Sequence, residues 1–461
     1  MRRKYFGDKK FYAMVMAVAM PIMIQNAITN FVGMLDNIMV GRVGTLQMSG
    51  VAIVNQLLFV FNLCVFGAVA GPGIFTAQFH GAGDQEGVRY TFRFKLIACC
   101  LISLVGLGIF ITVGEPLVLL YLKGEGEVQD LAQTLQFGKD YLQVMLWGIV
   151  PFALTNVYAG TLRETGETVV PMVGGISAVL VNLLFNYILI FGKLGAPVLG
   201  VRGAAIATVI SRFVELAIVA GWTHLHGDKK PFIRGAYRSL RIPRELTGKL
   251  MKKGMPLLVN EALWSAGMAV LSQCYSTRGL DVVSATNITN TIWNVFSVSF
   301  LSMGNAVGIL IGQMLGAGRA REDVKDTDRK LIVFSVLICV FFGGLMMAVS
   351  GVFPKIYNTT ESVRSLATEL ICIAAVMMPF SAYTNAAYFT LRSGGKVAVT
   401  LLFDCVFVWV VCVPLAFCLS RFTGMPIVPL YACCQATEAL KCVLGYLMLK
   451  RGTWIQNIVK V

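Results

Sequence analysis

Charged side chains are scarce in this sequence. Asp, Glu, Lys and Arg make up 14% of its 461 residues and hydrophobic residues 56%, whereas charged residues make up about a quarter of a soluble domain. This composition excludes an ordinary soluble domain and indicates a chain that lies in a membrane. The net charge of +15 comes from short basic clusters between apolar runs. Because no aromatic-basic RNA- or DNA-binding module accompanies them, we expect no nucleic-acid partner.

The motifs of ATP-driven transport, metal binding and catalysis are absent as well. No GxxxxGK[ST] sequence occurs, which argues against ATP-driven transport within this chain. The twelve cysteines form no CxxC pair and no Cys/His metal spacing, so we interpret them as packing residues. We find no nucleophile-base constellation and expect neither an enzyme nor a cofactor. The three histidines lie at predicted span ends, where we expect them to be solvated.

The first half of the chain reappears in the second half at an offset of 235 residues. Pro21 aligns with Pro256, and Gly81-Ala82-Gly83 aligns with Gly316-Ala317-Gly318, with no gap between these anchors. An internal repeat in an apolar chain is typical of transporters built from two equivalent halves.

Windows of about 20 apolar residues predict an all-α integral membrane protein with twelve transmembrane helices. They lie near 11–40, 50–79, 92–113, 137–161, 167–191, 203–223, 247–276, 283–314, 330–352, 366–391, 397–419 and 427–449. Connecting segments on one side hold about 28 Lys and Arg and those on the other about nine, so the positive-inside rule places both termini in the cytoplasm. We expect a multi-pass protein of the plasma (cell inner) membrane.

Each half contains six predicted spans. Because six is an even number, both halves enter the membrane from the same side and form a parallel repeat. We predict two pseudo-symmetric six-helix lobes at 1–223 and 247–461, joined by a cytoplasmic linker at 224–246, with rocking of the lobes giving alternating access. The basic stretch 224–253 is expected to be a flexible tether or a contact for anionic lipids.

Two of the five acidic residues within spans have a basic neighbour on the same helix face. Glu215 follows Arg212 by three residues, and Glu438 precedes Lys441 by three residues. Because residues at this spacing are neighbours on a helix, we interpret both as structural ion pairs.

The other three acids, Asp36, Glu261 and Asp404, have no basic residue at this spacing. An ionisable group in a membrane span needs a partner, a cavity or a function. Asp36 in the first span and Glu261 in the seventh, its repeat counterpart, are therefore our functional candidates. Asp404 lies near the cytoplasmic end of the eleventh span, where contact with interfacial water is an alternative to a transport role.

Asn182 and Asn186 share one face of the fifth span. With Asp36 and the Thr208 hydroxyl they form a set of oxygen ligands of the kind that Na⁺ prefers, so we predict a coupling-ion site here. The same residues also suit a proton on Asp36, with the amides hydrogen-bonding to the acid. Interhelical hydrogen bonds without ion binding are the alternative.

Polar stripes run along the second and eighth spans, and spacings of three, four and seven keep each stripe on one face. Such stripes line water-filled cavities, and nearby aromatic rings offer faces to organic cations, although simple packing is the alternative for the rings. The candidate substrate- or proton-binding residues are Glu261, Asn55, Asn62, Asn290, Asn294 and Tyr383.

Several short motifs occur together in a specific order. They are Pro21 with residues 36–42, residues 162–168, Asn182 with Asn186, residues 203–208 and residues 391–395. With these motifs and two parallel halves, the chain resembles the multidrug and toxic compound extrusion (MATE) family over nearly its whole length.

This resemblance implies secondary antiport, in which organic cations leave the cell as Na⁺ or H⁺ enters. It assigns Asp36, with its polar neighbours Asn182, Asn186 and Thr208, to the coupling ion, and Glu261 matches the span-seven Glu of the NorM-like and eukaryotic branches. The sequence departs from the DinF-like branch at Asn186, where an acid is usual, and lacks the span-ten acid of some NorM-like members.

Our leading hypothesis is a secondary active multidrug exporter that works as a monomer among membrane lipids. Its substrates are expected to be small organic cations, and its coupling ion Na⁺ or H⁺. One alternative is a flippase for lipid-linked or polysaccharide precursors, which shares this superfamily architecture. A facilitator without ion coupling is the other, but it needs no unpaired carboxylates in both halves.

Overall fold

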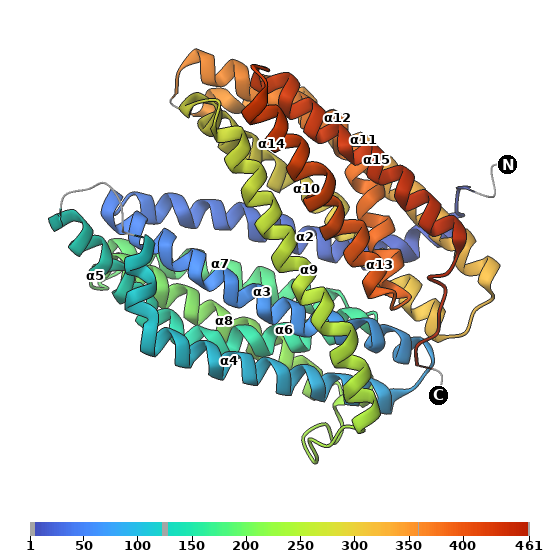
Figure 1. The fold of residues 1–461 in the computed structure, drawn as a ribbon. Coiled ribbons are helices and arrows are strands. Elements are labelled where there is room, and N and C mark those ends of the chain that lie inside the picture. Colours follow the sequence, from blue (N-terminus) through green and yellow to red (C-terminus); the bar gives the residue numbers. More distant parts are fainter. Residues whose placement is uncertain (1–4, 122–127, 358, 460–461) are drawn as a thin grey trace. The chain divides into compact units, whose positions relative to one another are not determined.

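The computed structural model describes residues 5–121, 128–357 and 359–459, except the side chains of residues 34, 36–38, 45, 120, 121, 128, 129 and 280. Within these ranges every regular element is helical (Figure 1). Twelve helical segments there are long and apolar enough to cross a membrane, one for each predicted span. The all-α fold expected from the sequence is therefore confirmed.

The helices of the first half, in chain order, are α2 (Lys9–Gly41), α3 (Thr45–Gly81), α4 (Gln85–Tyr121), α5 (Val128–Met145), α6 (Ile149–Glu164), α7 (Val169–Phe191) and α8 (Gly200–Leu225). A 3₁₀ turn at Leu146–Gly148 joins α5 to α6 just before Pro151, so these two helices form one span.

The second half contains α9 (Arg244–Ser276), α10 (Leu280–Gly316), α11 (Arg321–Val349), α12 (Glu361–Ser393), α13 (Val397–Leu401), α14 (Val413–Phe422) and α15 (Ile427–Arg451). Two π-helical turns, Leu402–Val406 and Val408–Cys412, connect α13 to α14 and complete the eleventh span.

The two copies of the repeat make the same turn after their second span. Gly83 has φ +77° and Gly318 has φ +66°, a left-handed conformation that residues with a Cβ rarely adopt. In both copies the amide of the preceding alanine donates to a glutamine carbonyl four residues earlier at 2.9 Å. The aligned Gly-Ala-Gly motifs thus encode one local structure.

Contacts divide the chain into two packing units, and the division falls inside three helices, α2, α3 and α9. The first unit comprises residues up to Met23, Ala77–Gly83 and the chain from Met255 onward, and the second comprises Ile24–Thr76 and Asp84–Gly254. The breaks in α2 and α9 lie beside Pro21 and Pro256, where the missing backbone N–H favours a bend. The predicted lobes at 1–223 and 247–461 are continuous in sequence. The packing units are not, because the start of α2 belongs to the first unit and the start of α9 belongs to the second.

The first unit is built on α10, α11, α12 and α15, with α12 packed against the other three (Figure 1). The N-terminal half of α2 joins its core, where Val15, Ala19 and Ile22 cluster with Met303 and Ala306 of α10. This packing holds the carboxylates of α9 and of the eleventh span within a continuous helical scaffold.

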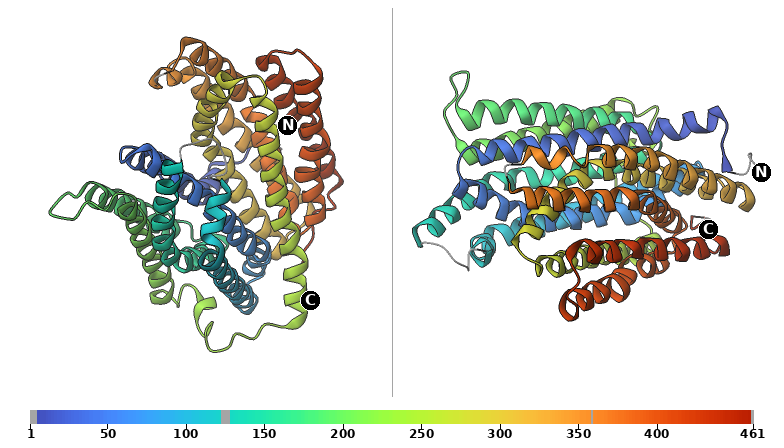
Figure 2. Two further views of the ribbon diagram at one scale, coloured as in Figure 1. Left: turned by 60° about the vertical axis from the view of Figure 1, so that its left-hand side comes forward. Right: turned by 90° about the horizontal axis from the view of Figure 1, so that it is seen from above.

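The second unit is built on α4, α6, α7 and α8 (Figure 2). Helix α6 contacts both α4 and α8. Helices α7 and α8 approach closely because Gly203 has no side chain: a Cβ there would lie 2.6 Å from the Leu189 carbonyl oxygen. This close approach brings the polar faces of α7 and α8 within hydrogen-bond distance.

Candidate functional site

A chain of polar contacts crosses the first unit from α9 to α15. Lys441 Nζ donates to Asp404 Oδ1 at 2.8 Å, and Asn260 Nδ2 donates to Asp404 Oδ2 at 3.2 Å. Asn260 Nδ2 also lies 3.5 Å from the Tyr388 hydroxyl, which donates to Glu261 Oε1 at 3.3 Å. The structure thus joins Glu261 and Asp404, both named from the sequence, through Asn260 and Tyr388, which were not.

Asp404 is paired with a base, contrary to the sequence-based interpretation. Lys441 approaches it from α15, and both side chains are largely buried, with exposed fractions of 8% and 17%. The expected pair of Lys441 with Glu438 is wrong, because Glu438 Oε2 instead accepts a hydrogen bond from Thr384 at 2.9 Å. A neighbour on another helix therefore takes precedence over the neighbour one turn away.

Asp404 lies within the first π-helical turn of the eleventh span. A π turn adds a residue to the helical repeat and shifts side chains around the helix axis, and such turns are frequent at functional sites. Lys441 also lies 5.2 Å from the centroid of the Phe403 ring in the same turn. The local distortion and the adjacent ring together position the ion pair.

Glu261 forms no ion pair within the described part of the chain. It is half-buried in α9, its hydrogen-bond donor is the neutral Tyr388, and Arg392 of α12 acts on it electrostatically without an ion-pair contact. A carboxylate inside a membrane span without a bonded cation is well placed to take up a proton or a cationic ligand.

In the second unit, α7 and α8 share a short relay of amide and hydroxyl groups. Asn186 Nδ2 donates to Asn182 Oδ1 at 3.1 Å, and Asn182 Nδ2 donates to Thr208 Oγ1 at 3.2 Å. The structure therefore brings three of the four predicted coupling-ion ligands together. The side chain of the fourth, Asp36 in α2, lies outside the described residues.

The remaining predicted site residues are distributed along α3, α10 and α12. Asn55 accepts a hydrogen bond from the Tyr141 hydroxyl at 3.3 Å and is otherwise exposed, and Asn62 is partly exposed. Asn290 and Asn294 are both exposed on α10. Tyr383 is partly buried in α12 and does not bond to Glu261, a role that Tyr388 takes.

The second unit holds a buried ion pair that sequence analysis missed. Lys95 of α4 is fully buried and pairs with Glu164 at the end of α6, while also donating to Thr161 at 3.2 Å. Both residues lie at the edges of predicted spans, where charge is common, so no sequence signal distinguished them. The predicted pair of Arg212 with Glu215 is not formed, since Arg212 donates to the Gly148 carbonyl at 3.1 Å.

The basic loop after α8 is hydrogen-bonded to α4 within the second unit. Arg93 donates to the carbonyls of Ala236 and Gly235, each at 2.8 Å, and Arg89 donates to Phe232 at 3.2 Å. Two buried or partly buried arginines of α4 therefore bind the backbone of the stretch that the sequence predicts to be a flexible tether.

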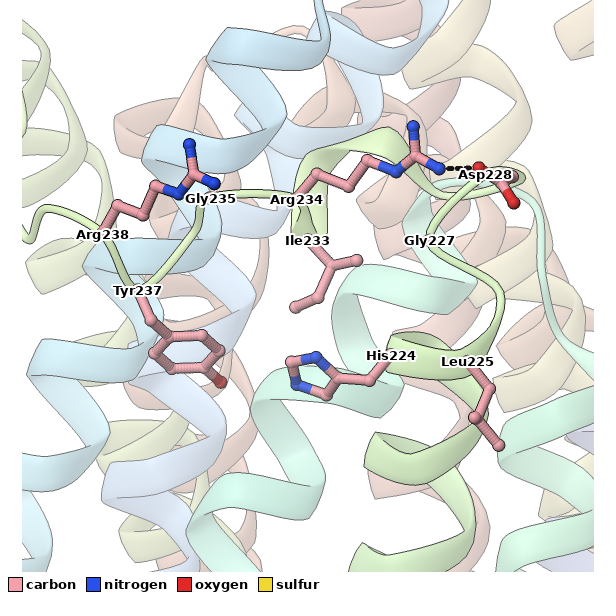
Figure 3. Close-up of a pocket in the computed structure, with 9 residues that line it drawn as sticks. All are labelled: His224, Leu225, Gly227, Asp228, Ile233, Arg234, Gly235, Tyr237 and Arg238. Carbon is pink, nitrogen blue, oxygen red and sulfur yellow. Dashed lines mark ion pairs between the residues drawn. The ribbon is translucent and has the colours of Figure 1, made fainter.

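A pocket of about 410 Å³ lies between this loop and the end of α8. Figure 3 shows the His224 and Tyr237 rings facing each other, with the Arg234 and Arg238 guanidinium groups pointing away from them. His224 is exposed, and its Nε2 lies 2.9 Å from the Tyr158 hydroxyl. The charged groups that line the pocket do not point to a common centre. We therefore interpret it as the space left where the loop packs against the end of α8.

The sequence matches the MatE family at residues 21–188 and 256–418. The two matched segments start at Pro21 and Pro256, which are the anchors of the 235-residue repeat. The chain is 25% identical over 447 residues to a probable multidrug resistance protein NorM of Thermotoga maritima, covering 96% of this chain and 93% of that protein. It is 23% identical to the probable multidrug resistance protein YoeA of Bacillus subtilis, with 92% and 90% covered.

Solved transporters share the fold over almost the whole chain. An outward-facing multidrug resistance MATE family transporter of the MOP superfamily superposes with a TM-score of 0.87 at 18% identity, covering 98% of both chains. A MOP superfamily transporter from Pyrococcus furiosus, described as having a binding pocket of reverse polarity, gives 0.85 at 18% identity with the same coverage. Because the matched family segments span more than half of the sequence, this protein belongs to the MatE family and is a multi-pass membrane transporter.

Proposed function

We propose that this protein is a secondary active multidrug exporter of small organic cations, driven by the inward movement of Na⁺ or H⁺. It would work by alternating access as a monomer in the plasma membrane, with both termini in the cytoplasm. The names of its relatives from Thermotoga maritima and Bacillus subtilis, which are probable multidrug resistance proteins, support a drug substrate.

The observation that supports this proposal most directly is the environment of Glu261. Asp404 is neutralised by Lys441 at 2.8 Å, whereas the hydrogen-bond partner of Glu261 among the described residues is a tyrosine hydroxyl at 3.3 Å. Burying a carboxylate in a span costs several kcal/mol unless a proton or cation compensates it. A drug cation and a coupling ion can therefore compete for Glu261, which is the requirement for exchange.

A second coupling position is proposed at Asp36. The relay of Asn186, Asn182 and Thr208 presents oxygen atoms in the second unit. With a carboxylate, such oxygens suit Na⁺, and they equally suit a protonated acid that donates to an amide oxygen. Either ion would couple export of the substrate to the ion's own inward gradient.

The membrane potential drives export only when exchange moves net positive charge inward. One net charge moving inward across about 100 mV yields about 2.3 kcal/mol, which corresponds to about fiftyfold accumulation of a substrate outside the cell. Because a leaving monocation carries one charge outward, exchange for one ion is electroneutral and is driven by the ion's concentration gradient alone, whereas exchange for two ions also uses the potential.

Ethidium efflux from proteoliposomes tests the proposal, with Na⁺ and pH gradients imposed separately. The gradient that drives the wild type identifies the coupling ion. Glu261→Gln and Asp36→Asn are each expected to reduce gradient-driven efflux at least about tenfold, because an amide neither titrates nor neutralises a cation. Glu115→Gln, which removes an exposed acid paired with Lys139, is the matched control and should transport normally.

Two results would contradict the proposal. Efflux by the wild type that depends on neither gradient would indicate a facilitator. Absence of ethidium transport, combined with movement of a fluorescent lipid-linked precursor between leaflets, would indicate a flippase.

A further inference from the structure

Counted over the residues that the structure describes, the charged side chains around Glu261 include one more negative than positive charge. Three carboxylates, those of Glu261, Asp404 and Glu438, face two cations, Lys441 and Arg392. Each of these five side chains acts electrostatically on at least one of the others, across α9, the eleventh span, α12 and α15. The cluster is therefore one positive charge short of neutrality when every group is ionised.

Lys441 is held in place as a permanent member of this cluster. Its amino group bonds to Asp404 at 2.8 Å and lies 5.2 Å from the Phe403 ring centroid, and its side chain is only 8% exposed. A buried lysine with a bonded carboxylate and an aromatic face has little to gain from moving to water. Its charge is thus a fixed feature of the first unit.

The cluster is accessible to a ligand at Glu261. Glu261 is partly exposed, whereas the adjacent Asn260 is fully buried. Asn260 donates both its described bonds, and its Oδ1 accepts no hydrogen bond from any described residue. A buried acceptor without a donor is unfavourable, so a ligand that brings positive charge or an N–H group would satisfy it.

We propose that Lys441 is a built-in counter-cation that leaves Glu261 able to accept one positive charge, so that the first unit selects singly charged over doubly charged organic cations. This inference rests on the proposed function, because it assumes that an organic cation binds near Glu261. It adds a specificity-determining residue that never needs to touch the substrate.

The physical reason is charge balance in a medium of low dielectric constant. A monocation brings the cluster to neutrality, whereas a dication leaves an excess positive charge near the ammonium group of Lys441. Repulsion between charges several ångströms apart at an effective dielectric constant of about 20 lowers affinity by about tenfold or more. Without Lys441 the cluster would carry two uncompensated negative charges and would favour a dication.

Ethidium and propidium provide a matched pair of probes, because they share one ring system and carry one and two positive charges. Equilibrium binding to the purified full-length protein is measured at constant pH and ionic strength, together with thermal unfolding. The wild type is expected to bind ethidium more tightly. In Lys441→Gln the ratio of the propidium Kd to the ethidium Kd should fall by about tenfold or more.

Three further variants separate this role from a structural one. Lys441→Arg keeps the charge and should keep the wild-type ratio. Lys441→Gln combined with Asp404→Asn restores the balance and should return the ratio to within about twofold of wild type. Asp404→Asn alone adds net positive charge and should shift the ratio in the opposite direction, which provides a test even if Lys441→Gln fails to fold.

The outcomes distinguish this inference from the proposed function. A wild type that binds neither probe would overturn the proposed function, and the inference with it. A wild type that binds ethidium, together with an unchanged ratio in Lys441→Gln and Asp404→Asn, would overturn the inference alone. Equal loss of both probes in the folded single variants would show that the Lys441 and Asp404 pair is only structural.

Discussion

Gly316 packs directly against the backbone of Gln78. A Cβ atom on Gly316 would lie 1.8 Å from the Gln78 carbonyl oxygen, and one on Gly81 would lie 1.9 Å from the Gln313 carbonyl oxygen. Gly81 and Gly316 are repeat counterparts, as are Gln78 and Gln313. The contact is therefore reciprocal, as at an interface with two-fold symmetry, and the repeat itself explains why glycine occupies both positions.

Replacing Gly316 with alanine should destabilise the protein by about 1–3 kcal/mol, because the helix ends must separate to admit a methyl group. Gly81→Ala should have a similar effect, since its contact is equivalent. Thermal unfolding of the purified protein measures both. Gly344→Ala in α11 is the control, because a Cβ there meets nothing within 4 Å, and a comparable loss of stability in it would contradict this explanation.

The buried pair of Lys95 and Glu164 should contribute strongly to stability. Lys95→Met leaves an uncompensated carboxylate and should destabilise the second unit by about 3–5 kcal/mol, whereas combining it with Glu164→Gln should recover much of this loss. Denaturant or thermal unfolding provides the measurement. Lys139→Met removes a partly exposed lysine from its pair with Glu115, and it should change stability by no more than about 1 kcal/mol.

Tyr388→Phe should weaken transport without unfolding the protein. It removes the hydroxyl that donates to Glu261, and hydrogen bonds to charged groups contribute about 1.5–3 kcal/mol, which corresponds to a change of about tenfold or more in affinity. Concentration dependence of ethidium efflux would show the change. Tyr446→Phe, at an exposed position on α15, should behave as wild type, and equal effects in both variants would argue against a specific role for Tyr388.

Lys230 makes the stability of the docked loop depend on pH. Burial lowers its pKa below the usual value, and its ammonium group donates to the Thr165 carbonyl at 3.2 Å. Because the unfolded chain binds this proton more tightly, stability should rise as pH increases through the lowered pKa towards 10.5. Lys230→Met should flatten this rise in thermal unfolding measured at increasing pH up to about 10.5. Lys229→Met, at the exposed neighbour, should retain it.

The C-terminal segment should detach when Gln78 is replaced. The Gln78 side chain donates to the carbonyls of Ser393 at 2.9 Å and Gln456 at 3.1 Å, and it accepts from the Ile458 amide at 2.8 Å. Gln78→Ala should therefore increase hydrogen exchange of the backbone at 452–459. Gln56→Ala, exposed on the same helix, should not. Unchanged exchange in Gln78→Ala would mean that other contacts retain the segment, among them buried Trp454 and the bond from Asn457 to the Gly316 carbonyl at 3.1 Å.

Contacts within one helix or one turn followed from the sequence, and contacts between helices did not. The spacing of Asn182 and Asn186 correctly placed both on one face, because helical geometry depends only on residue number. The same rule paired Glu438 with Lys441, yet Lys441 bonds to Asp404 on another helix. The rule identifies a possible neighbour, but the competing partner from the eleventh span depends on tertiary packing.

The sequence by itself determined the membrane location, the spans, the 235-residue repeat and the unusual position of Glu261, because length, hydropathy and helical spacing are properties of the chain. Only the tertiary structure decided that α2 and α9 divide between packing units beside Pro21 and Pro256, and that Tyr388 is the donor to Glu261. Those outcomes depend on which helix faces meet. In a chain whose helices are nearly all apolar, many pairings bury similar surface, and the few polar contacts discriminate among them.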